Sequence, residues 1–123
     1  MQQLSLAYRS SRINYYVFGK GSKIIFCLHG YGEDGSSFSF LEKYIDAEYT
    51  LYAIDFPFHG ATEWKEKDAF VTEDIVAIIQ LIAPAKNTIS LLAYSMGGRA
   101  TMHLLQLIPE KIDRVVLVEI ASG

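Results

Sequence analysis

Cysteine, proline and tryptophan are scarce in this sequence of 123 residues, which holds one, three and one of them respectively. The lone Cys27 has no second cysteine to pair with, so a fold held by internal disulfides is excluded. The apolar stretch Ile75–Ala83 is too short, and too closely flanked by acidic residues, for a transmembrane helix. Residues 1–3 also lack the basic and apolar regions of a signal peptide, and we therefore expect a cytoplasmic protein.

Basic residues are not in excess either. The chain has 11 Lys and Arg against 14 Asp and Glu, a net charge of −3, and no two basic residues are adjacent. Nucleic acids and acidic membrane surfaces attract proteins with clustered positive charge, so neither is expected as a partner. We expect a small-molecule partner instead, and the pattern predicts no metal site and no cofactor.

The hydrophobic residues, which make up 50% of the chain, fall into alternating strand-like and helix-like segments. Apolar and polar residues alternate between Leu4 and Phe18, with an interruption at 9–12, which predicts a β-hairpin. Further strands are expected at 23–28, 49–54, 88–94 and 114–120, and helices at 36–45, 68–83 and 96–108. This order is typical of one α/β domain with a mostly parallel sheet flanked by helices on both faces.

Ser95 lies between the predicted strand 88–94 and a helix that begins at Met96. Small residues, Ala93 and Gly97, stand two positions before and after it, as a sharp strand-to-helix turn requires. Such a turn exposes the serine hydroxyl and points the N–H groups and the positive dipole end of the helix at an oxyanion. The pattern is typical of a nucleophilic serine, although serine is also a preferred helix N-cap residue.

Three segments resemble motifs of the α/β-hydrolase superfamily. The run Ala93-Tyr94-Ser95-Met96-Gly97 is similar to its G-x-S-x-G motif, with Ala in place of the first Gly, and His29-Gly30 is similar to the H-G pair of its oxyanion loop. The run from Asp55 to Thr62 resembles the family's D-x-P-G-H-G-x-S loop, with Phe58 in place of Gly. Because Phe disfavours a positive φ, we expect the turn and the pocket wall at this loop to differ from the common form.

The resemblance implies a sheet order of 1-2-4-3-5-6 with the first strand antiparallel. It covers only the first half of such a fold, so residues 1–123 are interpreted as the N-terminal part of a single domain that ends after strand six. A lid and the C-terminal strands are absent from this part. An open sheet edge after strand six predicts a homo-oligomer formed through that edge.

The resemblance also implies the roles of individual residues. Ser95 is the expected nucleophile, and the backbone N–H groups of Tyr31 and Met96 are the expected oxyanion hole. His29 and Arg99 are predicted to bind the substrate, which is an ester, thioester or related acyl compound. His59 is interpreted as structural.

A base and an orienting acid for Ser95 are not identified in the sequence. His103 lies two helical turns away, roughly 12 Å, and Glu119 matches a frequent non-catalytic acid of the family. A general base typically raises the reaction rate about 10²–10⁴-fold, so the 123-residue chain alone is expected to be inactive.

Two alternative functions stay open. One is a pyruvate-eliminating lyase of the menaquinone-synthase branch, with Arg99 on a substrate carboxylate, and the other is a non-catalytic binding protein.

Overall fold

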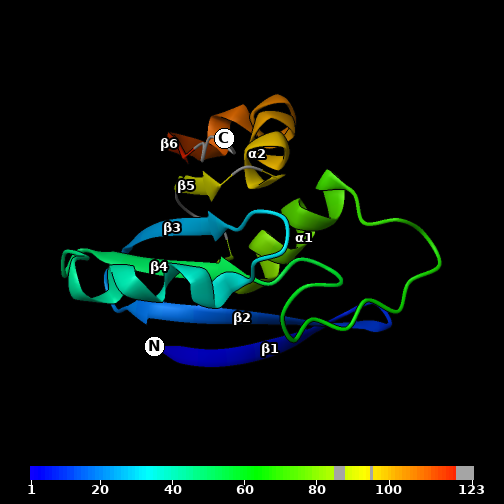
Figure 1. Ribbon diagram of the computed structural model, residues 1–123. Helices are drawn as coiled ribbons and strands as arrows, with labels where there is room; N and C mark the ends of the chain where they lie inside the picture. Colours follow the sequence, from blue (N-terminus) through cyan, green and yellow to red (C-terminus); the bar gives the residue numbers. More distant parts are fainter. Residues whose placement is uncertain (85–87, 95, 119–123) are drawn as a thin grey trace, which may run out of the picture.

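The protein is built on a single six-stranded sheet (Figure 1). The computed structural model describes residues 1–84, 88–94 and 96–118. Its strands follow the order β1-β2-β4-β3-β5-β6 across the sheet, which is the order that the family resemblance implies. The strands are β1 (Gln2–Tyr8), β2 (Ser11–Gly19), β3 (Lys23–Leu28), β4 (Tyr49–Ile54), β5 (Ile89–Tyr94) and β6 (Ile112–Val118), and the helices are η1 (Gly35–Lys43), α1 (Thr72–Ile82), α2 (Met96–Leu107) and η2 (Pro109–Lys111).

The strands β4, β3, β5 and β6 run parallel to one another. The first strand is antiparallel to its neighbour β2, but β2 is also antiparallel to β4, so β2 rather than β1 is the strand that runs against the rest of the sheet. Parallel strands end at the same edge of a sheet, so the loops after β3, β4 and β5 meet at one edge. This edge is where the candidate site lies.

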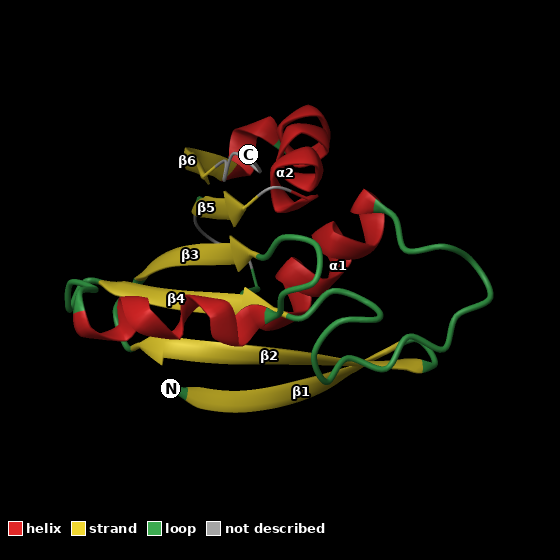
Figure 2. Ribbon diagram, in the orientation of Figure 1, coloured by secondary structure: helices red, strands yellow, loops and turns green. Residues whose placement is uncertain are grey.

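Two hydrophobic cores lie on opposite faces of the sheet. In β3, Phe26 and Leu28 belong to the core under α1 and α2, while Cys27 belongs to the core under η1. Successive side chains of a strand point to opposite faces of the sheet. Because both faces carry a core here, every position of the strand favours an apolar residue. Figure 2 shows η1 crossing one face while α1 lies behind the other.

Several element boundaries differ from the predicted ones. The segment 36–45 forms a 3₁₀-helix over Gly35–Lys43. The helix expected from residue 68 begins at Thr72, because Glu73 and Asp74 supply acidic side chains to the first turn and Asp74 accepts a 2.9 Å hydrogen bond from the Val71 N–H. Phe70 therefore precedes the helix, in the loop that leads to it.

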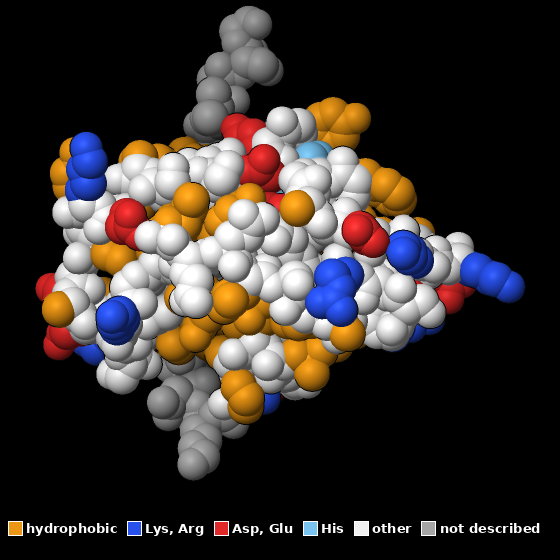
Figure 3. Space-filling model, turned by 90° about the horizontal axis from the view of Figure 1, so that it is seen from below, with side chains coloured by type: hydrophobic (Ala, Val, Ile, Leu, Met, Phe, Trp, Pro, Cys, Tyr) orange, Lys and Arg blue, Asp and Glu red, His pale blue; other side chains and the backbone are white. Residues whose placement is uncertain are grey.

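The surface shows no continuous basic patch on the face seen in Figure 3, where Lys and Arg side chains lie apart from one another. The strand β6 forms one edge of the sheet, and its Val116 and Leu117 side chains are exposed. Self-association through this edge stays a prediction. Within the described ranges, no helix has both the length and the apolar character needed to cross a membrane.

Candidate active site

The loop after β3 makes a tight turn at the edge of the sheet. The N–H of Glu33 donates to the carbonyl of Gly30 at 3.2 Å, and Gly32 has φ +78°, which suits glycine at the third position of a type II turn. The N–H of Gly32 donates to His59 Nε2 at 3.1 Å. Among the described residues, the N–H of Tyr31 has no hydrogen-bond partner, so it is available to an acceptor.

His29 is fully buried directly after β3. Its Nδ1 lies 2.8 Å from the carbonyl of Gly30, and its Nε2 accepts the N–H of Phe56 at 2.9 Å. A carbonyl only accepts and a backbone amide only donates, so the proton is on Nδ1 and the ring is neutral. Both ring nitrogens thus hold backbone groups of two loops, and the substrate contact that the sequence predicts for His29 stays a prediction.

Burial lowers the pKa of His29 below its ordinary value of 6.5. The unfolded chain therefore takes up a proton at a higher pH than the folded chain does, and acid favours unfolding. We expect the contribution of His29 to the free energy of unfolding to be constant above about pH 6.5 and to fall below it. Urea unfolding at about pH 7.5 and about pH 5 measures this loss.

The contribution of His29 is separated from that of other groups by two variants. In His29→Gln the acid-dependent loss should shrink, while His103→Gln, which changes an exposed ring, should keep it in full. An unchanged acid-dependent loss in His29→Gln would contradict this assignment.

His59 joins the loop after β4 to the loop after β3. Its Nδ1 lies 3.0 Å from the carbonyl of Pro57, while Nε2 receives the Gly32 N–H. Its ring centroid is 4.9 Å from that of His29, and Tyr31 approaches it edge-on at 5.7 Å. The structural role predicted for His59 agrees with these contacts, because both of its nitrogens are used to hold backbone.

Asp55, fully buried at the end of β4, holds three segments together. Its carboxylate accepts the side-chain amide of Asn14 at 2.8 Å, the N–H of Gly35 at 2.7 Å and the N–H of Ala61 at 2.9 Å. Thr62 keeps the hydroxyl that the family's serine would provide, because it donates to the carbonyl of Asp55 and accepts the N–H of Asn14. We call Asp55 and these partners the Asp55 cluster.

Phe58 corrects an expectation from the sequence. Its φ is +68°, so the turn adopts the left-handed conformation that Phe was expected to disfavour. This conformation costs a non-glycine residue about 1–2 kcal/mol. The loop is fixed on both sides, since the N–H of His59 donates to the carbonyl of Phe56 and Gly60 lies against the Asp55 carboxylate. The neighbouring contacts therefore impose the conformation on Phe58.

The first turn of α2 packs against the end of β3. A Cβ atom built on Gly97 would lie 2.3 Å from the carbonyl oxygen of Leu28, so only glycine allows this approach. The contact fixes the first turn of α2 against the last residue of β3, and the loop that holds Tyr31 follows that residue. Ser95 itself, like Glu119, lies outside the described residues.

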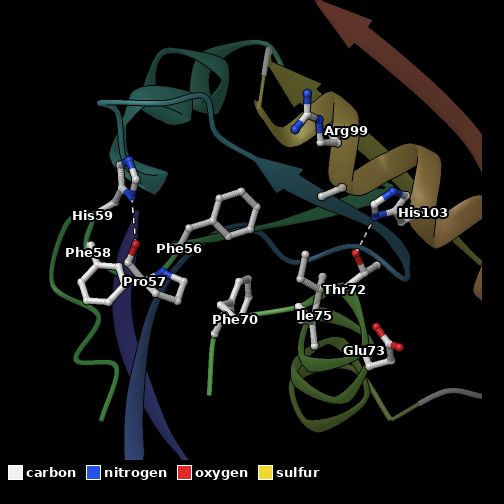
Figure 4. A pocket seen from close by; sticks show the side chains of 13 residues that line it. Phe56, Pro57, Phe58, His59, Phe70, Thr72, Glu73, Ile75, Arg99 and His103 are labelled. Atoms are coloured by element: carbon white, nitrogen blue, oxygen red, sulfur yellow. Dashed lines mark hydrogen bonds between the residues drawn. The ribbon is translucent and has the colours of Figure 1, made fainter. Parts of the chain in front are cut away.

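A groove of about 690 Å³ lies beside these loops (Figure 4). It is bounded by the loop after β4, the segment before α1, and one side of α2. On one side of it, His103 Nδ1 lies 3.1 Å from the Thr72 hydroxyl oxygen, and the exposed Arg99 lines it as well. Its lining residues are Phe56, Pro57, Phe58, His59, Ala69, Phe70, Val71, Thr72, Glu73, Ile75, Arg99, Ala100 and His103.

The sequence missed the lining contributed by residues 69–73, which were interpreted as part of a helix. The acidic pair Glu73 and Asp74 was the available signal, because acidic residues mark the first turn of a helix.

Cys27 is buried in the core, and burial raises the pKa of its thiol to about 12. A thiolate nucleophile at this position is therefore excluded.

The chain belongs to the alpha/beta hydrolase fold family, which it matches over residues 23–122. It is 29% identical over 98 residues to a Danio rerio "Serine hydrolase-like protein", covering 77% of this chain and 30% of that one. It is 28% identical over 120 residues to a Bacillus subtilis (strain 168) protein provisionally named a 2-succinyl-6-hydroxy-2,4-cyclohexadiene-1-carboxylate synthase, covering 93% of this chain and 43% of that one. The chain therefore spans less than half the length of these relatives.

Among solved structures, the chain is similar to the thioesterase domain from the curacin biosynthetic pathway, with a TM-score of 0.81 and 22% identity. The similarity covers 96% of this chain and 46% of the thioesterase. At this identity it shows a shared fold, and it supports the sheet order and the position of the loops described above.

Proposed function

We propose that this chain carries the nucleophile and oxyanion hole of a serine hydrolase that acts on an ester, thioester or related acyl compound. The observation that carries the proposal is the contact between Gly97 and the backbone of Leu28. It fixes the first turn of α2 against the end of β3, which directly precedes the loop whose Tyr31 N–H is available to an acceptor, and Arg99 of α2 lines the apolar groove.

The proposed reaction begins with attack of the Ser95 hydroxyl oxygen on the acyl carbon of the substrate. The carbonyl oxygen gains negative charge, which the N–H groups of Tyr31 and Met96 stabilise. The serine proton passes to a base, and the leaving alcohol or thiol takes it up as the carbon–oxygen or carbon–sulfur bond breaks. Water then attacks the acyl-serine, releasing the acid and restoring the serine.

The base does not come from the histidines of this chain. Both ring nitrogens of His29 and of His59 are engaged with backbone groups. His103 pairs with Thr72 on the far side of the groove. We propose that the base belongs to a part of the whole protein outside residues 1–123, so that this chain alone hydrolyses acyl substrates very slowly.

Labelling with a fluorophosphonate probe, which reacts with activated serines, tests this function. Two proteins are compared. One is the 123-residue chain, and the other is the longer product that is made where the gene continues past Gly123. We expect labelling to depend on Ser95 and the longer product to react about 10²–10⁴-fold faster, because only it contains the general base. The labelled residue is identified by mass spectrometry of the digested protein.

The matched control is Ser90→Ala, which removes a half-buried serine hydroxyl from β5, the strand that leads to the turn. This variant should label like the unchanged protein, while Ser95→Ala should not label. Equal labelling of Ser95→Ala would overturn the nucleophile assignment. A longer product that stays unlabelled would favour a non-catalytic binding protein.

A pyruvate-eliminating lyase is the second candidate. The match to the Bacillus subtilis protein and the position of Arg99 in the groove favour it. The guanidinium group can bind a substrate carboxylate through two parallel hydrogen bonds. The two candidate reactions differ in whether the substrate must carry a carboxylate. Elimination of pyruvate needs one, and hydrolysis of a simple ester does not.

A further inference from the structure

Phe58 combines two unfavourable features at one position. Its φ of +68° is a conformation that glycine adopts without strain, and its side chain is 85% exposed, the largest exposed fraction among the large hydrophobic residues of the described ranges. The aromatic ring therefore contributes little to the core of the described structure. A glycine here would allow the same turn without the strain.

Phe58 lies at the groove beside the candidate site. Phe58 and Pro57 lie on the side of the groove opposite Arg99 and His103 (Figure 4). The apolar interior between these sides includes Phe56 and Phe70, whose ring centroids are 5.9 Å apart.

One of the lining rings is supported by a residue outside the groove. The ring of Trp64 meets that of Phe70 edge-on at a centroid distance of 5.1 Å. Aromatic rings pack well against other aromatic rings in edge-on or offset geometry. The volume of the groove, about 690 Å³, falls in the range of small-molecule sites.

We infer that Phe58 is a specificity-determining residue that packs on an aromatic ring of the substrate bound in this groove. The inference deepens the proposed function, since it names an aryl-substituted acyl compound as the substrate class of the same site. The binding step does not require the reaction, because the ring of Phe58 and the interior of the groove are both in place without the nucleophile.

The test measures binding and stability together. The probes are 4-phenylbutanoate and hexanoate, two carboxylates that differ in having an aromatic ring or only an alkyl chain. Their dissociation constants are measured by NMR titration of the chain. In Phe58→Gly we expect the affinity for 4-phenylbutanoate to fall about tenfold and that for hexanoate less than about twofold. The thermal midpoint should stay the same or rise, since strain is removed.

Two variants serve as controls. Phe58→Tyr keeps the aromatic ring and should bind 4-phenylbutanoate like the unchanged chain. Phe40→Ala removes a 53% exposed ring from η1, on the other face of the sheet, and should leave both affinities unchanged.

Three results would overturn the inference. They are an unchanged affinity for 4-phenylbutanoate in Phe58→Gly, an equal loss for both probes, and no binding of 4-phenylbutanoate to the unchanged chain. A lower thermal midpoint with unchanged affinity would give Phe58 a packing role instead. Failure of Ser95 labelling would leave these binding results intact, so the two proposals are tested separately.

Discussion

Replacing Gly97 with alanine is expected to destabilise the protein by about 2–4 kcal/mol. The added Cβ would lie 2.3 Å from the carbonyl oxygen and 2.9 Å from the carbonyl carbon of Leu28. These are backbone atoms of a central strand, and they cannot move aside as a flexible side chain can. The first turn of α2 would have to shift away from β3. The loss is measured as the change in free energy of unfolding in urea.

Gly98→Ala is the matched control, because it makes the same chemical change one residue further along α2. There the new Cβ would lie 3.7 Å from the Leu117 side chain, an ordinary contact. Alanine is the better helix former, so this variant should be more stable by about 0.5–1 kcal/mol. Similar stability of the two variants would show that α2 does not pack on Leu28 as described.

The second large effect is expected at Asp55. In Asp55→Ala the side-chain amide of Asn14 and the N–H groups of Gly35 and Ala61 lose their common acceptor. Hydrogen bonds to a charged group are strong, and buried donors left without partners are costly, so we expect a loss of about 3–5 kcal/mol. Urea unfolding at neutral pH measures it.

Asp113→Ala is the control for Asp55→Ala. This carboxylate, on β6, is 62% exposed at its side chain and lies 4.0 Å from Arg114. Its removal should change the free energy of unfolding by less than about 0.5 kcal/mol. If both variants lost equal stability, the Asp55 cluster would not hold the loops together.

The strands could be located because each carries a local signal, whereas their order across the sheet was implied by the resemblance to the α/β-hydrolase superfamily. The continuous apolar run 23–28 indicates a strand with cores on both faces, and β3 lies at the centre of the sheet with one core on each side. The small residue Gly97 indicates a close backbone approach, and the contact with Leu28 is that approach. Local spacing was sufficient for these features, since each depends on a few neighbouring residues.

The contacts between loops could not be predicted in the same way. The ring of His29 accepts from the N–H of Phe56, 27 residues further along the chain, and His59 accepts from Gly32 over the same separation. No local pattern marks such a pair, because the partner is a backbone group that every residue has. The turn at Phe58 was predicted wrongly for another reason. The preference of a single residue disfavours its φ, and the contacts of its neighbours, from His59 to Phe56 and from Gly60 to Asp55, impose it.

The Asp55 cluster also bears on the order in which the protein assembles. Asn14 is separated by 41 residues from Asp55 and by 48 from Thr62, so their contacts close long loops of chain. Closing long loops costs entropy before the contacts can repay it, and folds rich in such contacts form slowly. We therefore expect the hairpin of β1 and β2 to complete its contacts only when the loop after β4 has formed. We also expect the loops that surround the groove to become ordered late in folding.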